Sequence, residues 1–183
     1  MKKALIFLAE GFEEVEALSV LDALKRGGVE VTTAAVGEDK AVKSSHGVTI
    51  VADVKVSEVK DSAFDLVFLP GGMPGSINLA QSWDVNEIVI RHSQSALVAA
   101  ICAAPAVVLG PAGLLEGKKA TCYPGCDEYY PGFEFSSEGV VEDGRIITAK
   151  SAAYGWKLGF VLVRRLMGEA AAEKVRSSIY WEF

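Results

Sequence analysis

The sequence has little positive charge, only two histidines and no long apolar run. Its 18 lysines and arginines are outnumbered by 24 acidic residues, which gives a net charge of −6. Nucleic acids and anionic membranes select basic surfaces, so this composition argues against both as partners. No apolar run approaches the roughly 20 residues of a transmembrane helix. The apolar start at residues 4–9 is ended by Glu10, so we expect a strand there rather than a signal peptide.

Cysteines are also few. Three cysteines, an odd number, do not suggest a disulfide framework, and we therefore expect a reducing, cytoplasmic location. Cys122 and Cys126 have a spacing seen in metal sites, but no second pair or histidine follows them. Partly buried thiols are the plainer interpretation. We expect no metal and no cofactor, since the chain carries no phosphate-binding or metal motif.

The chain does contain alternating strand and helix patterns. Half of its 183 residues are apolar, which is enough for one domain spanning 1–183. In the first helix, Val15, Leu18, Leu21 and Leu24 have helical spacing. The order predicts an α/β fold with a mostly parallel sheet and helices on both faces. We expect strands at 4–9, 29–36, 65–69, 97–101 and 118–122, helices at 13–28, 77–81, 85–93, 103–109, 155–167 and 169–179, and hairpins at 41–51 and 140–147.

The most informative segment is the apolar run 96–101, which stops at Cys102 and continues as Ala-Ala-Pro. A residue at a sharp strand-to-helix turn is presented at the carboxyl edge of the sheet, in a nucleophile elbow. The N–H groups at a helix start favour an anion, so we expect the pKa of Cys102 to be strongly lowered. The alternative is a buried structural cysteine.

Two other features follow strands and should meet Cys102 at the same edge. Gly71-Gly72 would let the backbone approach closely and offer N–H donors to an oxyanion, although a plain turn is the commoner role. Glu14 would be protonated beside a thiolate and donate a hydrogen bond to it. Alternatively, Glu14 is only a favourable charge at a helix start.

These residues carry a resemblance to a known family. The segments at 10–16, 69–72, 99–105 and 120–124 resemble the successive signatures of the ThiJ/PfpI superfamily, and specifically its DJ-one branch, which includes bacterial members. The resemblance implies a flavodoxin-like three-layer sandwich and a homodimer. It also implies that Cys102 is the nucleophile, that Glu14 is its protonated partner, and that the amides of Gly71, Gly72 and Ala103 form an anion pocket.

The sequence departs from the family pattern at several places. Tyr123 stands where many members have a histidine and is expected at the substrate site. Ala103 stands where the protease branch has its histidine, so peptide or amide hydrolysis by a Cys-His pair is disfavoured. The segment 150–154 replaces a Gly-Pro-rich stretch, which leaves the substrate preference open. His46 is expected near a dimer contact made by the first helix and the hairpin at 41–51.

The resemblance implies a cofactor-independent glyoxalase or deglycase that acts on small reactive carbonyls, such as methylglyoxal, or on their early protein adducts. A second hypothesis is an oxidative-stress sensor or redox-regulated chaperone that uses oxidation of Cys102. The residues do not decide between these two classes, because both need an activated thiol.

Overall fold

Strands and helices alternate along residues 1–182, which the computed structural model describes. The strands are β1 (Lys3–Leu8), β2 (Glu30–Ala35), β3 (Ala41–Lys43), β4 (Thr49–Val51), β5 (Val54–Lys55), β6 (Leu66–Leu69), β7 (Leu97–Ile101), β8 (Val140–Asp143) and β9 (Ile146–Ala149). The helices are α1 (Glu14–Arg26), α2 (Gly75–Gln81), α3 (Trp83–Ser93), α4 (Gly155–Met167) and α5 (Glu169–Ser178). Short helical turns are η1 (Val56–Glu58), η2 (Pro105–Leu109), η3 (Cys126–Tyr129) and η4 (Ala152–Tyr154).

One seven-stranded sheet has the order β5-β2-β1-β6-β7-β9-β8. All its neighbours pair in parallel except β8 with β9. This confirms the predicted α/β class with a mostly parallel sheet. The carboxyl ends of β1, β6 and β7 therefore lie together at one edge.

The strand expected at 118–122 does not form. Two amides of this segment donate to side chains instead of a neighbouring strand: Lys119 N–H donates to Asp143 and Thr121 N–H to Thr148 Oγ1, each at 2.9 Å. Side-chain acceptors thus satisfy the N–H groups that a strand would have used in a ladder.

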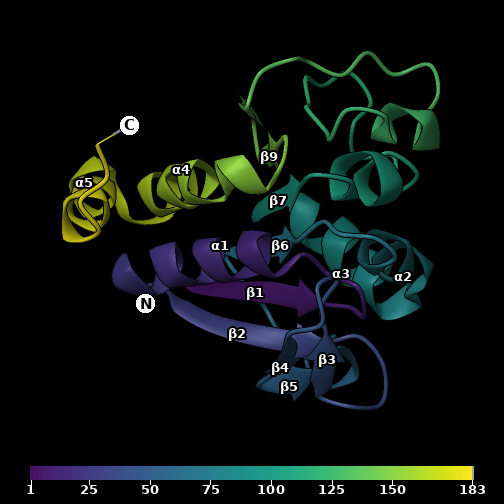
Figure 1. The fold of residues 1–183 in the computed structure, drawn as a ribbon, viewed down its shortest axis with the longest axis horizontal. Helices are drawn as coiled ribbons and strands as arrows, with labels where there is room; N and C mark the ends of the chain where they lie inside the picture. The colour runs from purple at the N-terminus through teal and green to yellow at the C-terminus, as the bar shows by residue number, and fades with distance from the viewer. Residues whose placement is uncertain (183) are drawn as a thin grey trace.

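Alternate residues of the central strands face two apolar layers. In β1, Ile6 and Leu8 pack on the side of α1, α4 and α5, while Leu5 and Phe7 pack on the side of α2 and α3. All four side chains are at most 2% exposed, as expected for a strand buried on both faces. Figure 1 shows α1 beside α4, with α5 following at the end of the chain. Among the described residues, no helix is both long and apolar enough to cross a bilayer.

Helix α1 buries only part of the face that its apolar spacing suggests: Leu24 is completely buried, but the start of the helix turns another face inward. Val15 and Leu18 are 52% and 39% exposed, whereas Glu16, Val20 and Ala23 are buried. The buried positions also follow helical spacing, at i, i+4 and i+7. The packing on α4 explains this choice, because a Cβ at Gly159 of α4 would lie 2.6 Å from the Cβ of Ala23. Two small residues allow the helices to approach closely along this line.

The hairpin expected at 41–51 is present. Strands β3 and β4 pair antiparallel in a small sheet of their own. The turn between them is fixed to the loop before α1, because Ser45 N–H donates to the Phe12 carbonyl at 2.8 Å. The hairpin therefore places His46 next to the start of α1.

Candidate active site

Cys102 occupies a strained turn directly after β7. Its φ angle is +63°, in the left-handed region that side chains other than glycine rarely adopt. Such a conformation costs on the order of 1–3 kcal/mol and persists only where the surroundings enforce it. Here Cys102 N–H donates to the Ala149 carbonyl at 2.9 Å, and Tyr123 N–H donates to the Cys102 carbonyl at 2.8 Å. The strained turn agrees with the nucleophile elbow expected at this position.

The carboxyl group beside Cys102 belongs to Glu16, not to Glu14. Glu16 is completely buried and shares a hydrogen bond with the Cys102 thiol. The Gly71 N–H donates to Glu16 Oε2 at 2.8 Å. The other oxygen, Oε1, is buried and has no hydrogen-bond partner of its own among the described residues. The expected acid is thus present, but two residues further along α1.

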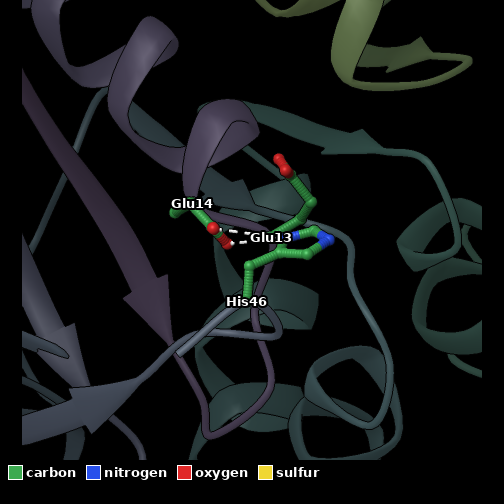
Figure 2. A group of neighbouring side chains, drawn as sticks. All are labelled: Glu13, Glu14 and His46. Atoms are coloured by element: carbon green, nitrogen blue, oxygen red, sulfur yellow. Dashed lines mark hydrogen bonds and ion pairs between the residues drawn. The ribbon is translucent and has the colours of Figure 1, made fainter. Parts of the chain in front are cut away.

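Glu14 lies on the other side of the helix. Successive residues of an α-helix are rotated by about 100°, so positions 14 and 16 face nearly opposite directions. Glu14 faces His46, whose Nδ1 lies 3.1 Å from Glu14 Oε1 (Figure 2). The assignment of Glu14 as the partner of the thiol was therefore wrong. Glu16, Val20 and Ala23 have helical spacing in the sequence, but only the packing of α1 on α4 identifies their face as the buried one.

The two glycines after β6 have different roles. A Cβ at Gly71 would lie 2.5 Å from the Cβ of Cys102 and 2.6 Å from Glu16 Oε2, so only glycine fits between them. Its amide donates to Glu16, which corrects the expectation that it serves the anion pocket. The amides that bond the sulfur of Cys102 are those of Gly72 and Ala103. Gly72 has φ +90°, which aims its N–H without a Cβ penalty.

Tyr123 touches the site through its backbone rather than its ring. Its amide holds the Cys102 carbonyl, while its side chain is 48% exposed. Tyr123 also lines a cleft of about 450 Å³ together with Cys122, Phe133 and Lys150. The backbone of Tyr123 therefore links this cleft to the elbow.

The ionisation of the pair is governed by burial. Burial, and next the charge of Glu13, raises the pKa of Glu16 to about 7. Burial and then the Glu16 carboxylate raise the pKa of Cys102, while the Gly72 and Ala103 amides lower it. The expectation of a strongly lowered pKa of Cys102 was wrong, because burial outweighs the amides at the turn and the sequence did not reveal how deeply both groups lie. A proton on Glu16 removes the like charge, one of the effects that oppose the thiolate.

Neither of the other thiols is activated. Burial raises the pKa of Cys122 to about 12, and burial followed by the charge of Asp127 raises the pKa of Cys126. Cys122 is buried and Cys126 partly buried, in agreement with the interpretation of both as partly buried thiols. All three cysteines are free thiols.

The second histidine is structural. His92 Nε2 accepts from Phe64 N–H at 3.1 Å, and Nδ1 lies 2.7 Å from the Ile88 carbonyl. Burial lowers the pKa of His92, which favours the neutral ring. With both ring nitrogens occupied far from the elbow, His92 cannot act as the base of Cys102.

A cysteine elbow with a buried glutamate and two amide donors matches one protein family in particular. The sequence profile of the DJ-1/PfpI family matches residues 2–165. The chain belongs to this family. Over 100% of both chains, it superimposes on a solved structure of "Toxoplasma gondii DJ-1, oxidized" with a TM-score of 0.96 and 33% sequence identity.

Curated relatives agree with this assignment. The chain is 42% identical to Protein DJ-1 homolog B of Arabidopsis thaliana over 95% of its own length, although it spans only 40% of that longer protein. It is also 33% identical to the "Glutathione-independent glyoxalase DJR-1.2" of Caenorhabditis elegans, over 91% of this chain and 90% of the relative.

Proposed function

We propose that this DJ-1/PfpI protein is a cofactor-independent glyoxalase that converts small 2-oxoaldehydes such as methylglyoxal to 2-hydroxy acids. The observation that carries the proposal is the buried Glu16 carboxyl in hydrogen-bond contact with Cys102. The nucleophile, Cys102, and the proton carrier, Glu16, are then in direct contact. The relative named as a glutathione-independent glyoxalase supports the same reaction.

In this mechanism the Cys102 thiolate adds to the aldehyde carbon, and the new C–S bond gives a hemithioacetal whose oxygen takes a proton. The amides of Gly72 and Ala103 stabilise the oxyanion while it forms. Glu16 supplies the proton to this oxygen and is left ionised. It then removes the proton from the same carbon and returns it to the neighbouring carbonyl carbon, while the hydroxyl proton passes to the neighbouring oxygen, which leaves a thioester. Water then cleaves the C–S bond and releases lactate. The aldehyde carbon is oxidised and its neighbour is reduced, so no external oxidant is needed.

The pKa of Glu16 suits this role. A carboxyl group that titrates near pH 7 can both accept and release a proton at neutral pH, whereas an ordinary glutamate cannot hold one there. Deglycation of early protein adducts would use the same thiol and acid on a different substrate, and we include it in the proposal as a second reaction of this site. A Cys-His amidase or protease is disfavoured, because no histidine among the described residues bonds Cys102.

The proposal is tested by incubating the purified protein with methylglyoxal and measuring lactate. We expect turnover by the wild type and none by Cys102→Ser, with Cys122→Ser as a matched control that retains activity. Failure of the wild type to form lactate, with correctly folded protein, would reject the glyoxalase.

A second candidate function is an oxidative-stress sensor or redox-regulated chaperone. Cys102 is only partly buried, and its two amide donors suit a sulfinate. The Toxoplasma structure is described as oxidized. Peroxide treatment followed by mass spectrometry would favour this function if Cys102 gains two oxygens at low peroxide while lactate formation is absent.

We also propose a cytoplasmic homodimer. Val15 and Leu18 on α1, with Val48 and Val51 on the neighbouring hairpin, form a set of exposed apolar residues. Monomers rarely leave such groups uncovered, and a two-fold interface would bury each set against its copy. Three free thiols agree with a reducing compartment.

A further inference from the structure

Three metal-ligating side chains converge outside the Cys102 site. Glu13, Glu14 and His46 each offer one ligand atom, and these atoms all lie within 4.8 Å of one another. Two come from the start of α1 and the third from the turn of the β3–β4 hairpin. Figure 2 shows His46 directly facing Glu14, with Glu13 beside them.

The three donors are held in place by neighbouring contacts. Glu13 Oε2 accepts from Glu16 N–H at 2.6 Å, which fixes its side chain as the cap of α1. Ser45 N–H donates to the Phe12 carbonyl at 2.8 Å, which ties the hairpin turn to the same loop. A site assembled from two segments needs such ties, because free loops would pay the ordering cost when a ligand binds.

The charge of the cluster is not compensated by a lysine or arginine. In the described part of the chain, Glu14 pairs only with His46, and Glu13 takes part in no ion pair. The His46 Nδ1 lies almost equally far from both Glu14 oxygens, at 3.1 and 3.2 Å. A divalent cation would replace this contact and would balance the charge of the two carboxylates.

We propose that Glu13, Glu14 and His46 form a binding site for a first-row divalent transition metal of the Zn²⁺ type. The imidazole separates this set from a purely acidic surface cluster, because a nitrogen donor with two carboxylates suits zinc, cobalt or manganese better than calcium. His46 is 70% exposed in the single chain, which leaves room for further ligands. Water, or groups of the second copy in the proposed dimer, would complete the coordination sphere. No local sequence motif indicates the site, because Glu14 and His46 are 32 residues apart in the sequence.

Titration with Co²⁺ in a non-coordinating buffer at pH 7.5 tests the proposal. We expect one equivalent to bind with visible d–d absorption and no sulfur-to-cobalt charge-transfer band. His46→Gln and Glu14→Gln should each weaken binding at least about tenfold, as loss of one ligand commonly does. Glu38→Gln removes an exposed carboxylate elsewhere and should leave binding unchanged.

Three outcomes would overturn the proposal. A sulfur-to-cobalt charge-transfer band would show that the metal binds the cysteines. Equal Co²⁺ affinity of His46→Gln and the wild type would show that the imidazole is not a ligand. Absence of binding at millimolar Co²⁺ would leave Glu14 and His46 as an ion pair only. The readout is spectroscopic, so it does not depend on whether the protein converts methylglyoxal.

Discussion

At the residue scale, the site depends on how closely a thiol, an acid and a glycine can approach. Gly71 separates Cys102 from Glu16 and leaves no room for a Cβ. The sequence predicted a glycine pair, an elbow cysteine and an acid at one edge, because each follows a strand or begins a helix. It did not predict which glutamate turns inward. That choice depends on the packing of α1 against α4, which local spacing alone does not encode.

Gly71→Ala tests this packing. We expect a loss of unfolding free energy of about 1–3 kcal/mol, the usual cost of forcing a methyl group into a filled space. We also expect the rate of Cys102 alkylation by iodoacetamide to change, because the new Cβ separates Glu16 from the thiol. Chemical denaturation and alkylation rates measure both effects. Unchanged stability and reactivity would mean that the close approach is not real.

The raised pKa of Glu16 has a consequence for stability. Its ordinary pKa of 4.5 applies to the unfolded chain and a pKa of about 7 to the folded protein, so the folded state holds the proton more tightly between these values. Stability from this group is complete below pH 4.5 and is lost as the pH rises through 7, by on the order of 3 kcal/mol.

We therefore expect the stability difference between wild type and Glu16→Gln to shift against the wild type between pH 4.5 and 7. Glutamine keeps the shape but does not titrate, so all other groups cancel in the comparison. Denaturation midpoints across this range measure the difference. A difference that does not vary with pH would show that Glu16 has an ordinary pKa.

At the scale of elements, α1 uses its faces for different purposes. The face with Glu16, Val20 and Ala23 packs inward, and the face with Val15 and Leu18 is exposed. The sequence predicted the helix and its length well, because its spacing is regular. Its apolar spacing located Leu24 on the buried side but was misleading for Val15 and Leu18, which are exposed although they are more apolar than the buried Glu16 and Ala23. The prediction of a strand at 118–122 was wrong for a related reason. Side chains of distant residues accept hydrogen bonds from this segment, and no strand in the described part of the chain pairs with it.

Gly159→Ala tests the contact between α1 and α4. Alanine favours a helix over glycine by about 0.5–1 kcal/mol, but its Cβ would lie 2.6 Å from the Cβ of Ala23. Overpacking outweighs the propensity, and we expect a net loss of about 1–2 kcal/mol in unfolding free energy. Thermal denaturation measures it. A stabilised variant would mean that the helices have room to separate.

At the scale of the whole molecule, the parallel sheet brings the site together. Its strands β1, β6 and β7 are neighbours in the sheet and end at one edge, although the loops that follow them are far apart in the sequence. This convergence was predictable, because alternating strands and helices have few possible arrangements. The short strand β5 was not predicted, since two residues give no periodic signal.

The proposed dimer is tested by light scattering. We expect a mass near twice the 19.4 kDa of the chain, and Val51→Glu should shift it towards the monomer by burying a charge in the interface. Ile90→Glu changes an exposed apolar residue on α3 and serves as the control, which should leave the mass unchanged. A wild type that stays monomeric at micromolar concentration would contradict the dimer.

The most direct test of the account is the rate of lactate formation from methylglyoxal by Glu16→Gln. The amide can still donate a hydrogen bond to Cys102, yet it cannot carry a proton between adjacent carbons. Glu30→Gln makes the same chemical change at an exposed position near the opposite edge of the sheet and provides the control. We predict that Glu16→Gln loses about 10²–10⁴-fold in turnover, while Cys102 in this variant still reacts with iodoacetamide. Turnover of Glu16→Gln at the level of the Glu30→Gln control would contradict the assignment of Glu16 as the proton carrier.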